Sequence, residues 1–98
     1  MARPFIDRDK VVHFCRRHHI SRLALFGSIL RDDHRADSDV DVLVEFENNH
    51  TPGLAFFAMQ EELSEILQRP VDLNTRNFLS PYFRDRVAAE AEVVYDKT

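Results

Sequence analysis

Two aspartates, Asp39 and Asp41, stand two residues apart at the head of the valine-rich run 40–46. On a strand, residues two apart point to the same face, and strand rise alone puts their Cα atoms about 6.5 Å apart. Two carboxylates at that spacing can bind a hard cation such as Mg²⁺, which prefers oxygen ligands together with substrate phosphates. Because their like charges repel, the pair requires a cation or nearby solvent.

A second feature lies upstream, where Gly27-Ser28 follows the short apolar run 22–26 and is separated from Asp39 by ten intervening residues. Glycine allows a sharp turn at a strand end and brings backbone N–H groups close to a ligand. Ser28 adds a hydroxyl at an expected helix N-terminus, where free N–H groups and the helix dipole favour phosphate. A phosphate cradle beside a metal-binding pair indicates phosphoryl or nucleotidyl transfer.

A third carboxylate, Asp72, falls in the predicted strand 71–74. If that strand neighbours 40–46, Asp72 can reach the same cation and accept the proton of an attacking hydroxyl. Sequence spacing does not show whether the two strands are adjacent. An aspartate that merely ends a strand therefore stays open as the alternative.

Each part of this pattern is common by itself, as a turn, a solvated loop or a calcium site, but the combination is specific. A phosphatase of the haloacid-dehalogenase type carries its two aspartates at the C-terminal end of an apolar strand, whereas here the apolar run follows Asp41. A calcium-binding EF-hand loop needs Gly at its sixth position and Glu at its twelfth. Counting from Asp39 places Val44 and His50 there, and counting from Asp37 fails equally.

Hydrophobic periodicity, capping residues and turn residues predict the elements that position these side chains. The expected order is helix 7–19, strand 22–26, a short helix near 28–31, strand 40–46, helix 54–68, strand 71–74 and helix 81–92, with 93–95 as a closing strand or the tail of that helix. This order predicts an α/β (α+β) fold, a small mixed sheet of three to four strands flanked by helices. The polarity of the strands is left open by the pattern.

The length of 98 residues predicts a single domain over 1–98, since two domains would each be too small for a stable core. With 17 acidic and 13 basic residues the net charge is −4, which argues against direct nucleic-acid binding. No apolar run is long enough to span a bilayer, the N-terminus does not read as a signal peptide, and Cys15 is the sole cysteine. We therefore expect a cytoplasmic protein without a membrane partner.

The spacing Phe26-Gly27-Ser28, ten residues, Asp39-Val40-Asp41 resembles the signature of the polymerase-β-type nucleotidyltransferase superfamily. Arg31, the run 37–39 and the ending 79–86 are similar to the minimal nucleotidyltransferase branch, the antitoxin partners of HEPN-domain toxins. The resemblance covers about residues 20–95. It implies a polymerase-β-like nucleotidyltransferase palm for the fold.

The resemblance also implies a role for each matching residue. Gly27 and Ser28 would hold the β- and γ-phosphates of the nucleotide, and Asp39 and Asp41 would bind two Mg²⁺ ions. Asp72 would complete one metal site and activate the incoming hydroxyl. The implied activity is transfer of AMP from ATP to a hydroxyl, a tyrosine of a HEPN ribonuclease toxin, which neutralises the toxin within a hetero-oligomer.

Two residues leave alternatives open. Arg31 either contacts phosphate or forms a surface salt bridge. Many relatives carry Gly after this arginine, where this chain has Asp32, and an added carboxylate near a phosphate site weakens nucleotide binding. A binding module that neutralises the toxin by covering it is therefore the alternative function. A nucleotidyltransferase acting on a small molecule is a third and less favoured alternative, since such enzymes usually carry extra helices to hold the substrate and 98 residues leave little room for them.

Overall fold

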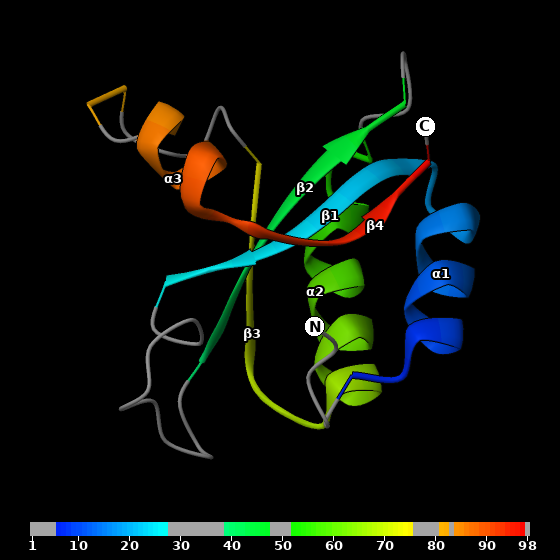
Figure 1. Ribbon diagram of the computed structural model, residues 1–98. Helices are drawn as coiled ribbons and strands as arrows, with labels where there is room; N and C mark the ends of the chain where they lie inside the picture. Colours follow the sequence, from blue (N-terminus) through cyan, green and yellow to red (C-terminus); the bar gives the residue numbers. More distant parts are fainter. Residues whose placement is uncertain (1–5, 28–38, 48–51, 76–80, 83, 98) are drawn as a thin grey trace.

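The computed structural model describes residues 6–27, 39–47, 52–75, 81–82 and 84–97 (Figure 1). Along the chain its elements are α1 (Arg8–Arg17), β1 (Ile20–Phe26), β2 (Val40–Phe46), α2 (Ala55–Leu67), β3 (Val71–Asn74), α3 (Arg84–Glu90) and β4 (Glu92–Asp96). Strands 40–46 and 71–74 have their predicted bounds. The short helix predicted near 28–31 lies outside the described residues.

The four strands form one sheet in the order β3-β2-β1-β4. β1 pairs antiparallel with β2 and with β4, whereas β2 and β3 pair in parallel. The prediction of a small mixed sheet flanked by helices is therefore confirmed. The strand polarity that the sequence pattern left open follows from the connections, because α2 carries the chain from the end of β2 back to the start of β3.

The first helix begins where Asp7 caps it. The Lys10 backbone N–H donates to Asp7 Oδ1 at 3.2 Å, which satisfies one of the free amides at the helix N-terminus. The helix buries three side chains, Val11, Phe14 and Cys15, against the sheet. Its predicted start is thus confirmed, and its end falls two residues earlier than the predicted His19.

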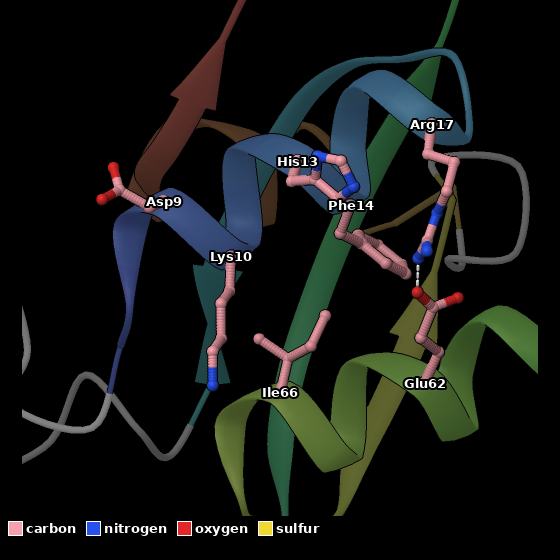
Figure 2. Close-up of a pocket in the computed structure, with 7 residues that line it drawn as sticks. All are labelled: Asp9, Lys10, His13, Phe14, Arg17, Glu62 and Ile66. Atoms are coloured by element: carbon pink, nitrogen blue, oxygen red, sulfur yellow. Dashed lines mark ion pairs between the residues drawn. The ribbon is translucent and has the colours of Figure 1, made fainter.

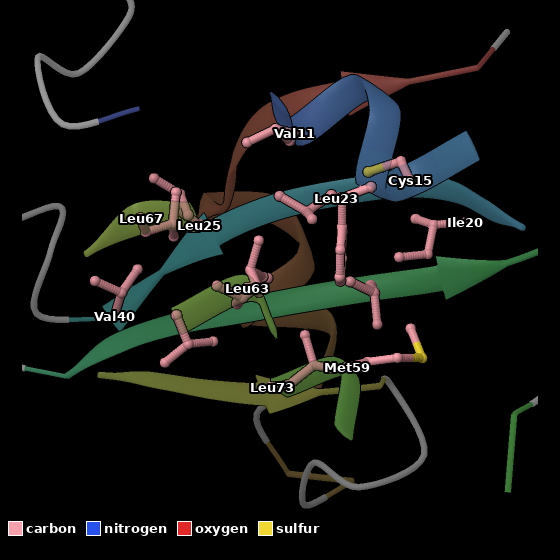
Figure 3. Close-up of a cluster of buried hydrophobic side chains, with 14 of the residues drawn as sticks. Val11, Cys15, Ile20, Leu23, Leu25, Val40, Met59, Leu63, Leu67 and Leu73 are labelled. Carbon is pink, nitrogen blue, oxygen red and sulfur yellow. The ribbon is translucent and has the colours of Figure 1, made fainter. Parts of the chain in front are cut away.

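The second helix carries an apolar stripe at three-to-four spacing, and its buried members are Phe56, Met59, Leu63 and Leu67. Figure 1 shows α1 and α2 side by side on one face of the sheet, with α3 set apart from both. Side chains of both helices meet those of the strands in one buried apolar cluster (Figure 3). No helix in the described ranges is long and apolar enough to cross a membrane.

The end of the chain departs from the prediction in one respect. The helix predicted over 81–92 is shorter, since Pro81 and Tyr82 form a turn and α3 spans Arg84–Glu90. Glu92 instead pairs with Leu25 of β1 and begins β4. Strand pairing therefore removes the last residues from the helix, and 93–95 belongs to a closing strand.

Candidate active site

The register between β2 and β3 places Asp41 directly opposite Asp72. Paired residues on neighbouring strands face the same side of a sheet, and the strands lie about 4.8 Å apart. Asp41 is half-buried and Asp72 is exposed. The structure thus answers the question of adjacency that spacing alone could not, because it puts the third carboxylate beside the first pair.

Asp39 lies exposed just before the first residue of β2. Burial raises the pKa of Asp41, and the negative charges of Asp72 and then Asp39 raise it further. All three carboxylates therefore contribute to one negative field, in which the ionised form of Asp41 is costly. A cation or a protonated neighbour would relieve that cost.

Gly27 directly follows β1 and lies beside the same carboxylate, since Phe26 pairs with Asp41 across the antiparallel ladder. Its φ of +78° lies in the left-handed region. A Cβ atom built on Gly27 would overlap Asp41 Oδ2 and would lie 3.1 Å from Asp41 Cγ. The sequence predicted a turn and a close backbone approach to a ligand here, but not that the missing side chain makes room for the aspartate.

The two faces of β2 divide as the alternation predicts, with one exception. Val40, Val42 and Val44 are fully buried in the core on the helical side. On the acidic side, however, Leu43 is only 5% exposed. It lines a small hollow together with Ala24 and Ala91, so this face is not open along its whole length, while Asp41 is half-buried.

The three carboxylates Asp39, Asp41 and Asp72 offer oxygen donors, the kind of ligand that a hard cation prefers. In the described ranges, no group of three His, Cys, Asp or Glu side chains has its atoms arranged to hold a metal ion. The fit of magnesium therefore rests on the chemistry and charge of these side chains. Ser28, Arg31 and Asp32 lie outside the described residues.

A second hollow lies away from these aspartates, on the helical layer between α1 and α2 (Figure 2). Its lining residues are Asp9, Lys10, His13, Phe14, Arg17, Glu62 and Ile66. Glu62 forms an ion pair with Arg17 and contacts His18 Nε2 at 2.9 Å. Since none of the three site aspartates lines it, this hollow is not the candidate active site.

Comparison with known sequences gives a consistent result. The model of the nucleotidyltransferase domain family matches residues 8–94. A candidate protein adenylyltransferase of Methanocaldococcus jannaschii is 34% identical over 84 residues, covering 86% of this chain and 89% of its own. The protein adenylyltransferase MntA of Thermococcus cleftensis is 36% identical over 77 residues, covering 78% of this chain and 74% of its own.

Solved structures agree with this result. A candidate minimal nucleotidyltransferase, 37% identical, superposes with a TM-score of 0.70 over 86% of this chain and 85% of that chain. A toxin–antitoxin crystal structure with AMP-PNP, 19% identical, gives a TM-score of 0.74 over 93% of this chain and 74% of that chain. A complex of tri-AMPylated HEPN toxin with MNT antitoxin from Shewanella oneidensis, 20% identical, gives 0.59 over 91% and 69%. The last two likenesses show the fold alone.

The observed fold agrees with the resemblance that the spacing of Gly27, Asp39 and Asp41 indicated. The family match over residues 8–94 and the likeness to a minimal nucleotidyltransferase agree with it as well. The chain therefore belongs to the nucleotidyltransferase domain family, in its minimal nucleotidyltransferase branch.

Proposed function

We propose that this nucleotidyltransferase transfers AMP from ATP to a tyrosine hydroxyl of a HEPN-domain toxin and thereby neutralises it. The observation that carries the proposal is the register that sets Asp41 opposite Asp72, with Gly27 packed against the Asp41 carboxylate. The sequence of this chain is also 34% and 36% identical to those of two relatives named as protein adenylyltransferases, which supports transfer of AMP. The solved complex of a HEPN toxin with an MNT antitoxin, whose fold this chain shares, supports the choice of partner.

The proposed roles follow from the positions of the three carboxylates. Asp39, Asp41 and Asp72 would hold two Mg²⁺ ions, which when bound supply charge neutralisation for the triphosphate and the pyrophosphate that leaves. Gly27 would place its backbone close to the phosphates, with Ser28 and Arg31 completing the contacts.

In the proposed reaction, the acceptor oxygen forms a bond to the α-phosphorus and the bond from that phosphorus to the β-phosphoryl oxygen breaks. Asp72 is exposed, unlike the half-buried Asp41, so an acceptor hydroxyl can reach it. It would take the proton of that hydroxyl, and the pyrophosphate would leave with the electron pair of the broken bond.

Labelled ATP tests the proposal directly. The purified chain is incubated with Mg²⁺ and a lysate of the source cells, once with ATP labelled at the α-phosphate and once with ATP labelled at the γ-phosphate. Adenylyl transfer predicts a protein band labelled only from the α-position, and peptide mass analysis is expected to place AMP on a tyrosine of a HEPN-domain protein. A band labelled from the γ-position would instead mean phosphoryl transfer.

A matched pair of variants separates the site from general effects. Asp41→Asn removes one charge at the site, and Asp9→Asn removes one from the exposed first turn of α1. We expect the band to vanish only with Asp41→Asn. A labelled RNA or small molecule would keep the chemistry and reject the toxin as acceptor, and no label at all from a folded chain would favour the binding module.

A further inference from the structure

The strand that carries Asp72 is short and lies at the edge of the sheet. β3 has four residues, and among the described strands its single neighbour is β2. Alternate residues of a strand direct their N–H groups to opposite sides, so two amides of β3 face away from β2. These are the amides of Val71 and Leu73, the residues immediately before and after Asp72.

Both outward amides donate to side chains of α2. The Val71 N–H donates to Ser64 Oγ at 3.0 Å, and the Leu73 N–H donates to Gln60 Oε1 at 2.9 Å. Gln60 and Ser64 stand four residues apart on the helix, one turn, which matches the rise of two strand residues. The helix thus takes the place of a second strand neighbour along this edge.

Ser64 is itself held in place. Its hydroxyl donates to the Gln60 carbonyl oxygen at 2.9 Å, which leaves its lone pairs directed to Val71. Its own carbonyl accepts the Arg69 N–H at 3.2 Å in the connection that leads into β3. One serine therefore fixes both the entry to the strand and the residue before Asp72.

We propose that Gln60 and Ser64 are positioning residues, which hold β3 in the register that sets the Asp72 carboxylate opposite Asp41. The proposal rests on the role of Asp72 proposed above. Covering a sheet edge also guards against aggregation. The same two hydrogen bonds also bracket Asp72, the residue that the proposed reaction uses.

The proposal predicts a particular kinetic signature. Ser64→Ala and Gln60→Ala each free one amide beside Asp72, and a misplacement near 1 Å costs up to about 100-fold in rate. We expect kcat to fall about 10- to 100-fold, with KM for ATP within about twofold because Asp39, Asp41 and Gly27 lie outside β3 and α2. Ser64→Thr keeps the hydroxyl and is expected to restore most of the rate.

Ser21→Ala is the matched control. Ser21 Oγ donates to the Glu45 carbonyl oxygen at 3.1 Å, at the end of the β1–β2 pair away from Asp41. The substitution Ser21→Ala therefore removes a hydrogen bond between a serine side chain and the backbone, as Ser64→Ala does. We expect the kcat of Ser21→Ala to match that of the wild type. Equal kcat values for Ser64→Ala and Ser21→Ala would overturn the proposal, as would a failure of Ser64→Thr to recover activity.

Two further measurements distinguish this proposal from the proposed function. An inactive wild type, or an Asp72→Asn variant with full activity, would refute the role of Asp72 and the positioning proposal with it. If the wild type is active and Asp72→Asn is inactive, the role of Asp72 stands. The comparison of the Gln60 and Ser64 variants with Ser21→Ala then tests the positioning role alone. Hydrogen exchange should show faster exchange at Val71 and Leu73 in the alanine variants, and unchanged exchange there would also reject the proposal.

Discussion

Replacing Gly27 by alanine perturbs the site in two separable ways. The residue has φ +78°, and a Cβ atom there would overlap Asp41 Oδ2. Gly53 is the matched control, since its φ is +63° but a Cβ atom there would meet nothing within 4 Å. The pair therefore shares the backbone cost and differs in the contact with the aspartate.

The magnitudes follow from that difference. An L-residue in the left-handed region costs about 1–2 kcal/mol, and both variants carry this cost. For a domain of this length each kcal/mol lowers Tm by about 4–8 °C. Gly27→Ala must additionally displace the Asp41 carboxylate, and a displacement near 1 Å at a reacting centre costs about 100-fold in rate.

The assay measures AMP transfer per folded molecule, with urea unfolding to determine the free energy of unfolding of each variant. Gly53→Ala should lose stability and keep its activity, whereas Gly27→Ala should lose at least as much stability and about 100-fold in activity. Equal activity of the two variants would refute the reasoning, because it would mean that the carboxylate does not need the space that Gly27 leaves.

Three other predictions concern titratable groups. Because burial and the charges of its neighbours raise the pKa of Asp41, its ionised form destabilises the fold, so Asp41→Asn should raise the urea midpoint at pH 7, with a gain that shrinks as pH falls through the folded-state pKa. Burial first, and then the charges of Arg17 and His19, lower the pKa of His18. The free energy of unfolding should therefore decrease as pH drops below about 6.5, and urea unfolding of His18→Gln should show a smaller decrease over the same pH range. Burial raises the pKa of the Cys15 thiol to about 12, so a thiol reagent should label it only at the rate of unfolding, and rapid labelling of the native chain would contradict its burial.

Much of the fold follows from local patterns in the sequence. The recurrence of valine at every second position predicted β2 with its observed bounds, and the stripe from Phe56 to Leu67 predicted α2 to within one residue at each end. The N-cap of α1 at Asp7 likewise follows from a pattern of neighbouring residues. The ends of α3 were not, because Glu92 joins the sheet through pairing with β1, a contact distant in sequence.

The candidate site required information that no local pattern holds. The sequence singled out Asp39 and Asp41 from their spacing, but the neighbour of β2 depends on strand order, and only the parallel register brings Asp72 opposite Asp41. The contact between Gly27 and Asp41 likewise arises from the pairing of β1 with β2. The hydrogen bonds of Gln60 and Ser64 left no signal, since both residues read as ordinary polar positions of an amphipathic helix.

The register at the site is fixed from two directions that do not depend on each other. On β2, a slip of one residue would turn Asp41 into the core and bring buried valines to the acidic face, so the cost of burying a carboxylate holds this strand in place. On β3, Val71 and Leu73 are buried on either side of the exposed Asp72, so the same constraint acts there. The helix side chains that accept the amides of these two residues add a second constraint. The two carboxylates therefore meet because hydrophobic constraints on both strands and a polar constraint on β3 specify the same register.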